Sequence, residues 1–293
     1  MPGSKKILKF WEYFLTTISW LGSMYLFFSV GFLLFFLLSK GIAAINLNLF
    51  FGSAPIWPAI IGRFPVWDGI WPAFVGTLAL GFLSTIISLP LGIGCGIYLA
   101  LFAKQPWKLY FNFVVDLLAS IPSIVMGLFG FALILFIRKT FLPQANTCLF
   151  LASFCLAILV LPYLISTTEN AICVIPEEKR LIGISLGLNH WQNFFFVLLP
   201  QASKGILSGI ILAVGRAVED TAVILLTGVV ANAGLPRGLW DKFEALPFYI
   251  YYVSSEFRGP TELQKGFGAC LTLLILTSIL FLIAHILQKW ISR

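Results

Sequence analysis

The sequence predicts an all-helical, polytopic protein that crosses a membrane six times. Hydrophobic residues make up 59% of its 293 residues and charged residues only 11%, and the mean hydropathy is +0.97. Such a chain has too little polar surface to cover a soluble globule. Its apolar runs exceed the roughly ten residues of a barrel strand and do not alternate. They favour helices, because a helix satisfies its backbone hydrogen bonds within one segment.

Six windows with few or no charges are long enough for the about 20 residues that a helix needs to cross the hydrocarbon core. They lie within residues 12–40, 68–104, 110–137, 147–168, 204–231 and 265–289. The first is too long for a signal-peptide core and lacks a small-residue cleavage pattern before Lys40, so we expect it to remain as a membrane helix. We expect residues 1–70 to form this helix and an external loop, and residues 71–293 to form the core.

The even number of spans places both chain ends on one side of the membrane. With the N-terminus inside, ten Lys and Arg residues lie inside and eight outside, which is a weak bias. The cluster Lys5, Lys6 and Lys9 beside the first span therefore decides the prediction of a cytoplasmic N-terminus. Two long outer segments, 41–71 and 232–262, are rich in Pro and aromatic residues. They form either re-entrant or interfacial caps, or ordinary loops.

The longest polar interruption on the inner side, residues 175–200, predicts a helical hairpin. Pro176 suits the first helical position, and Glu178 falls in the first turn, where a carboxylate favours the helix dipole. Gly187 can adopt the left-handed conformation that ends a helix, and the Asn-x-x-Gln at 189–192 resembles a capping box for a second one.

The second helix of this hairpin carries more apolar surface than an isolated hairpin leaves in water. Trp191 and the Phe-Phe-Phe-Val run at 194–197 precede Pro200. We expect this surface to dock into a partner. The alternative is an amphipathic pair that lies on the membrane or packs on the protein's own helix ends.

Gly187, followed after nine residues by Val197-Leu198-Leu199-Pro200, resembles the EAA loop of ABC importer permeases. In that family the loop is a coupling helix seated in a groove of the cytoplasmic ATPase. The usual Glu-Ala-Ala is replaced here by Leu-Ile-Gly at 181–183, and Glu178 could supply the carboxylate from one turn earlier. The resemblance implies ATPase contacts through Glu178, Leu181, Gly183, Gly187, Trp191 and Pro200.

Three charged residues interrupt the fifth span. Arg216, Glu219 and Asp220 are spaced i, i+3 and i+4, so in a continuous helix they share one face and can pair. An isolated charge at this depth costs several kcal/mol. The cluster is either a structural ion pair that locks helix packing, or an oxyanion site in which the guanidinium binds bidentately and the acids keep binding weak.

The same region is similar to the phosphate-specific transport (Pst) permeases. Those subunits have Arg, three residues, then Glu-Thr; Arg216, Asp220 and Thr221 take these places, and Glu219 replaces a common Gly. Further matches are the segments 89–92, 96–100, 120–129 and 167–169, and 246–251 resembles the A-type subunit more than the C-type. The resemblance covers about residues 71–291 and implies a MetI-like, type I importer fold.

Ser120 and Ser123 flank Pro122 within the third predicted span. Proline lacks the N–H that continues a helix, so Pro122 favours a kink. Small hydroxyls beside a kink could line a polar path. The alternative is that both hydroxyls hydrogen-bond to their own helix backbone.

No sequence motif here binds nucleotide phosphates or a catalytic metal, and we expect no cofactor. The net charge of +7 is spread without a dense basic patch, which argues against nucleic acid. The resemblance implies an inner-membrane permease subunit of an ATP-driven importer for inorganic phosphate. Its partners would be a second permease subunit, two ATPase subunits and an external phosphate-binding protein.

Other functions stay open at this point. The cargo could be another oxyanion, or the chain could be the C-type partner subunit. A different class is an ion-coupled secondary transporter that uses Arg216, Glu219 and Asp220 as a proton relay. A membrane-embedded enzyme would need a nucleophile and base pair, and the sequence offers no plausible one.

Overall fold

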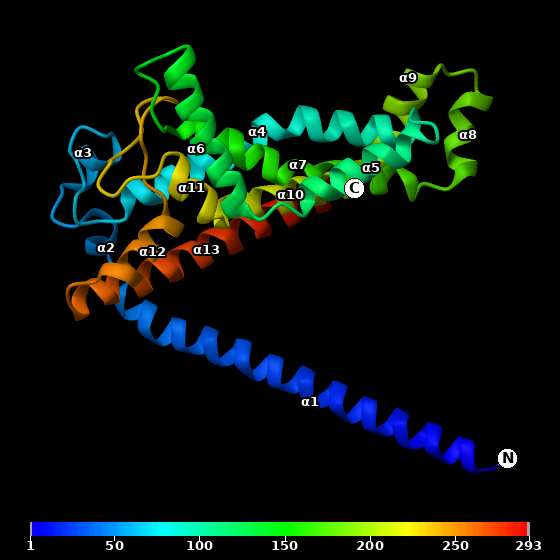
Figure 1. Cartoon of the computed structure of the whole chain (residues 1–293), viewed down its shortest axis with the longest axis horizontal. Coiled ribbons are helices and arrows are strands. Elements are labelled where there is room, and N and C mark those ends of the chain that lie inside the picture. The colour runs from blue at the N-terminus through cyan, green and yellow to red at the C-terminus, as the bar shows by residue number, and fades with distance from the viewer. Residues whose placement is uncertain (1, 292–293) are drawn as a thin grey trace.

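The computed structural model describes residues 2–291, and in this range the chain is built from helices (Figure 1). Six of them are long and apolar enough to cross a membrane, as the sequence predicts. The long helices are α1 (Pro2–Gly41), α4 (Trp71–Leu101), α6 (Ser123–Thr140), α7 (Leu149–Cys173), α10 (Leu199–Glu219) and α13 (Pro260–Ile291). The short ones are η1 (Ile42–Ala44), α2 (Leu47–Phe51), α3 (Ile56–Ile60), α5 (Trp107–Ala119), α8 (Glu177–Ser185), α9 (His190–Asn193), the π-turn η2 (Phe194–Leu198), α11 (Ala222–Thr227) and α12 (Leu246–Glu256).

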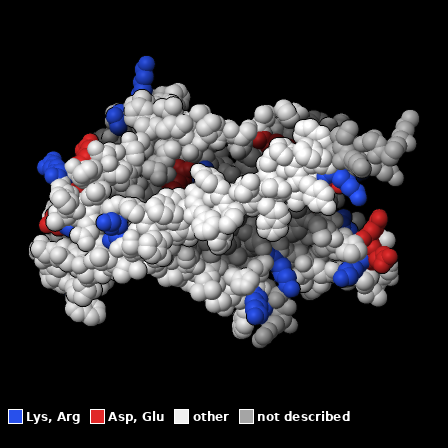
Figure 2. All heavy atoms as spheres, turned by 90° about the horizontal axis from the view of Figure 1, so that it is seen from below, with Lys and Arg blue, Asp and Glu red and all other residues white. Residues whose placement is uncertain are grey.

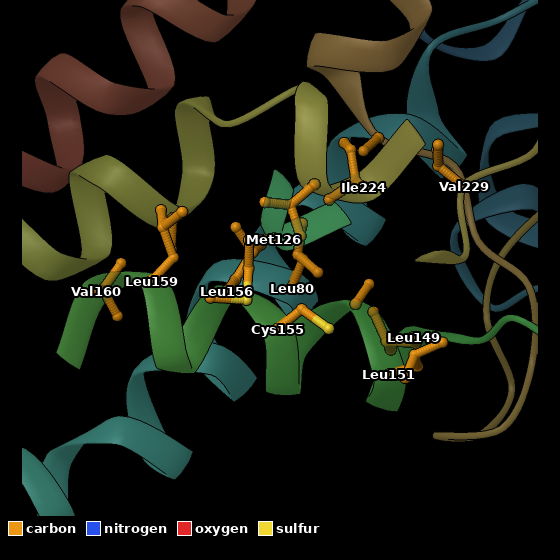
Figure 3. Packing of buried hydrophobic residues seen from close by; sticks show 14 of the residues in the cluster. Leu80, Met126, Leu149, Leu151, Cys155, Leu156, Leu159, Val160, Ile224 and Val229 are labelled. Atoms are coloured by element: carbon orange, nitrogen blue, oxygen red, sulfur yellow. The ribbon is translucent and has the colours of Figure 1, made fainter. Parts of the chain in front are cut away.

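Helix α7 is the centre of the core and packs against both α4 and α10. Its residues Leu156 and Leu164 are fully buried, and Leu156 packs with side chains of α4, α6 and α11 (Figure 3). Small residues let these helices approach closely: a Cβ on Gly92 of α4 would lie 2.6 Å from the Cβ of Leu164. Such close packing is typical of helix pairs in membranes, where dispersion contacts replace the hydrophobic effect.

Helix α1 diverges from the rest of the molecule (Figure 1). Its contact with α13 lies at the end of the helix, where the rings of Phe36 and Phe267 are 5.7 Å apart and Gly41 abuts Leu271. The apolar side chains of α1 from Phe10 to Phe36 are exposed. On the face shown in Figure 2, much of the surface between the two ends of the molecule carries no charged side chain.

The third predicted span, 110–137, is wrong as a single helix. The chain forms α5 and α6 instead, and Ser120–Pro122 separates them. Pro122 is extended, with φ −61° and ψ 138°. Proline cannot donate the next helical hydrogen bond and disfavours helical geometry in the residue before it, so the predicted kink is a complete break.

The fifth span also differs from the prediction, because α10 ends at Glu219. Asp220 is extended, with φ −73° and ψ 126°, and a new short helix, α11, follows. The Oδ1 of Asp220 accepts a hydrogen bond from the N–H of Val223 (2.9 Å). Aspartate favours such local bonds at helix starts over a place inside a helix, which accounts for the interruption.

The two outer segments contain short helices rather than only loops. Helices α2 and α3 lie in the first, where Phe51, Ala59 and Val66 form a small core of their own. The second contains all of α12, whose start lies against the core, since the N–H of Leu246 donates to Oγ1 of Thr77 in α4 (2.8 Å).

Candidate functional site

Arg216 and Asp220 form an ion pair across the end of α10. The Nη2 of Arg216 lies 3.6 Å from Oδ2 of Asp220, and the side chains are 42% and 2% exposed. This distance is too long for a hydrogen bond. Because Oδ1 of Asp220 is already bonded to the Val223 N–H, the carboxylate is fixed in place. The guanidinium keeps its donors available for another acceptor.

The prediction that all three charges share one helix face is wrong. Asp220 leaves the helix and turns into the core, whereas Glu219 is exposed and has no polar contact among the described residues. Only the pairing of Arg216 with Asp220 is confirmed. Thr221 follows the break, is half-buried and begins the turn into α11.

Packing of α10 orients Arg216 away from the core. The neighbouring Gly215 contacts Phe281 of α13, and Val218 contacts Gly81 of α4. These contacts bury one side of the helix and leave Arg216 and Glu219 on the opposite, exposed side. The guanidinium of Arg216 therefore lies on the surface of this chain, and the helix around it is largely apolar.

The start of α6 lies near the break at Asp220. A Cβ on Gly127, one turn after Ser123, would lie 2.8 Å from the carbonyl oxygen of Ala222. Ser123 is half-buried as the first residue of α6. Ser120 is exposed, and its Oγ donates to the carbonyl of Leu117 (2.7 Å), which confirms the backbone-bonded alternative for this hydroxyl.

The predicted hairpin is present, with two corrections. Gly187 has φ +80° between α8 and α9, and the capping box of Asn189 and Gln192 is complete. Pro176, however, precedes the first helical residue instead of occupying that position. The second helix does not end as a separate unit: it continues through η2 into α10, so Pro200 lies in the first turn of that span.

Some apolar side chains of the hairpin are buried within the chain, and others are exposed. Phe194 and Leu198 are each 3% exposed and pack on the protein's own helix ends, as the alternative interpretation expected. Leu181 is 50% exposed and Trp191 is 60% exposed. Glu178 is exposed too, whereas Gly183 is buried against Asn193. Exposed apolar side chains thus remain on both arms of the hairpin, and the first arm also carries the exposed Glu178.

Sequence analysis missed two polar contacts where helices end near the hairpin. Lys108 of α5 and Glu169 of α7 form an ion pair with 2.9 Å between Nζ and Oε1. Arg180 of α8 donates to the carbonyls of Ile172 and Ile175. The ion pair joins helices that are distant in sequence, and the Arg180 bonds join helices separated by a turn. No rule of sequence spacing predicts either contact.

A buried acid in the outer loops was missed as well. Glu244 is 7% exposed, and its Oε1 accepts the N–H of Gly234 (2.8 Å). Burial raises the pKa of Glu244 to about 7, although the N–H groups of Gly234 and Ala233 lower it. Gly234 also lines an outer cavity of about 580 Å³ whose basic side chains include Arg63 and Lys242.

Among the described residues, no cluster of three or more His, Cys, Asp or Glu residues could hold a metal ion. The chemistry that the site offers is anion contact by Arg216 beside a fixed carboxylate.

Comparisons with known proteins give a consistent picture. Residues 92–293 match the family model described as the inner membrane component of binding-protein-dependent transport systems. The phosphate transport system permease protein PstA of Haemophilus influenzae is 32% identical over 246 residues, which cover 83% of this chain and 82% of that protein. The PstA of Pasteurella multocida is 31% identical over 263 residues, 89% of each chain.

A solved structure shares the fold. The inward-facing MetNI methionine ABC transporter contains a chain that superposes with a TM-score of 0.60 at 19% identity. The superposition covers 81% of this chain and 98% of that one. The predicted type I importer fold is therefore confirmed.

Proposed function

This chain belongs to the family of inner membrane components of binding-protein-dependent transport systems, and we propose that it is the permease subunit of an ATP-driven importer of inorganic phosphate. The observation that carries the cargo proposal is Arg216, a guanidinium with free donors in an apolar helix. The relatives named as phosphate transport permeases support the same cargo.

The exposure of Arg216 and Glu219 supports a second permease subunit. A charged side chain at the bilayer centre costs about 2.5–3.5 kcal/mol or more when it faces lipid. A partner that covers this side of α10 would remove the charges from lipid and enclose a polar path. Thr221 follows the break at Asp220, and Ser123 begins α6, which packs on α11 through Gly127; both would line that path.

Within the path, the ion pair limits how tightly the anion is held. Phosphate oxygens match the planar donor fork of Arg216, so a bidentate contact can form. Asp220 is fixed 3.6 Å from the same guanidinium and competes electrostatically with the anion. The result is transient binding, which a transport path requires for release.

The energy comes from a separate ATPase in this proposal. The hairpin 175–200 exposes the apolar side chains of Leu181 and Trp191 and the carboxylate of Glu178, and these would seat in an ATPase groove. Gly187 and Pro200 delimit that surface, and Gly183 allows its two helices to pack closely. The assembly would contain two ATPase subunits, one for each permease chain, and an external phosphate-binding protein.

The ion-coupled carrier has less support. A relay through Arg216, Asp220 and Glu219 requires the third group to contact the other two, yet Glu219 has no polar contact with either of them in the described structure.

The test is uptake into proteoliposomes that contain the assembled complex. ATP inside the vesicles with binding protein outside should drive uptake of labelled phosphate but not of labelled sulfate. Uptake of sulfate alone would change the cargo. Uptake driven by a pH gradient in vesicles that contain only this chain would instead establish the carrier.

A further inference from the structure

The inner end of α7 is held by polar contacts from two sides. Arg180 reaches it from α8, the first helix of the hairpin, and Lys108 reaches it from α5. These side chains do not take part in the candidate anion contact. They lie at the end of α7 next to the hairpin, away from the break at Asp220.

Arg180 joins the hairpin to α7 through its guanidinium. Its Nε donates to the carbonyl of Ile175 (3.1 Å) and its Nη2 to that of Ile172. The carbonyl of Ile172 lies in the last turn of α7 and that of Ile175 just beyond the helix, and a guanidinium offers several donors that can bond both. The carbonyl of Arg180 in turn accepts from Nδ2 of Asn193 in α9 (2.9 Å).

The surroundings of this junction are tightly packed. Ile172, Ile175, Phe194 and Leu198 are buried in one cluster that joins the end of α7 to the second arm of the hairpin, while Arg180 and Asn193 connect the first arm to it. Close-packed side chains transmit displacement rather than absorb it. A movement of the hairpin therefore carries the end of α7 with it.

The second contact joins α7 to α5. Lys108 and Glu169 are 2.9 Å apart, with side chains 27% and 13% exposed, and Nδ2 of Asn112 lies 3.5 Å from the same Glu169 oxygen. Val115 is the only buried residue of α5. Val115 packs with Leu99 and Ile165, and the polar contacts with Glu169 add to this attachment of α5, which leads directly to the break at Ser120–Pro122.

We propose that the inner end of α7 is a mechanical relay: Arg180 carries hairpin movement into α7, and the Glu169–Lys108 pair passes it to α5 and the break beside the candidate path. Arg180, Glu169 and Lys108 are positioning residues and do not touch the cargo. The inference rests on the proposed function, since it requires an ATPase that moves the hairpin.

The test uses the complete transporter with Arg180→Gln or Lys108→Gln. Both variants should assemble and hydrolyse ATP, while the phosphate transported per ATP hydrolysed falls about tenfold, which corresponds to about 1.4 kcal/mol of coupling free energy. Arg180→Lys should give a transport ratio between those of the parent and Arg180→Gln, because one ammonium group cannot reproduce the several fixed donors of the guanidinium. Lys179→Gln and Lys104→Gln remove exposed charges beside the same positions and should leave the ratio unchanged.

Two outcomes would overturn the relay. One is an unchanged transport ratio in both glutamine variants. The other comes from the double variant Lys108→Glu with Glu169→Lys, which exchanges the two charges and serves if a single variant does not assemble. If this double variant assembles but the phosphate transported per ATP hydrolysed stays low, the relay is contradicted. Recovery of that ratio supports the relay. Failure of the proposed function would be distinct, because the unsubstituted complex itself would then transport no phosphate.

Discussion

Arg216 and Asp220 face each other across the end of a helix, 3.6 Å apart, rather than along its surface. Asp220 can take this position because α10 stops one residue earlier and its carboxylate caps the next turn through Val223. This arrangement buries the carboxylate of Asp220 and leaves the guanidinium of Arg216 partly exposed. It combines a fixed negative charge with a guanidinium that is still able to bind an anion.

Replacement of Arg216 should strongly reduce phosphate uptake without loss of the complex. Loss of a desolvated charge contact costs about 2–5 kcal/mol, so Arg216→Ala should reduce uptake by at least about 30-fold. Arg216→Lys should retain more activity because the charge stays. Uptake of labelled phosphate by the reconstituted transporter measures both. Arg258→Ala, at an exposed site, is the control, and normal uptake by Arg216→Ala would refute the anion contact.

Asp220 should matter for stability as well as for transport. Asp220→Ala leaves the buried N–H of Val223 without an acceptor and should lower the free energy of unfolding by about 1–3 kcal/mol. Asp220→Asn keeps an oxygen at the same place and should be close to the parent protein in stability. Thermal unfolding of the purified chain in detergent compares the two. Equal stability of both variants would show that the Val223 bond contributes nothing.

The exposed and buried aromatic residues of the hairpin should respond differently to truncation. Trp191 is 60% exposed, so Trp191→Ala should weaken ATPase binding by about 30-fold, as for an interface hot spot worth about 2 kcal/mol. Phe194→Ala should instead destabilise the chain itself by about 3–5 kcal/mol, because Phe194 is 3% exposed. Affinity for the purified ATPase and thermal unfolding separate these effects. Unchanged ATPase affinity in Trp191→Ala would place the interface elsewhere.

The outer loops should become less stable as the pH rises from about 4.5 to 7. Burial raises the pKa of Glu244 from 4.5 to about 7 in the folded state, so the folded chain binds this proton more tightly than the unfolded chain. The stabilisation is complete below pH 4.5 and lost above about pH 7. Glu244→Gln should remove this dependence, and Glu256→Gln, at an exposed site, should retain it. Unfolding followed across this pH range provides the measurement; an identical profile for the parent and Glu244→Gln would contradict the assignment.

Several features of the fold could be predicted because their physical causes are local. Apolar length sets the number of spans, and the capping box at Asn189 with the left-handed Gly187 defines the hairpin. The effect of Pro122 was predicted in kind but underestimated in extent, since a kink and a complete break leave the same local signal.

The sequence by itself determined the membrane class, the number of spans and the residue types that can contact an anion, because hydropathy and charge are properties of short segments. The tertiary structure decided where those residues point. Packing against α4 and α13 turns Arg216 outward, and Asp220 enters the core because its helix ends. The Lys108–Glu169 pair likewise depends on how α5 lies on α7. Such contacts join segments distant in the chain, and only the packed helices bring them within a few ångströms.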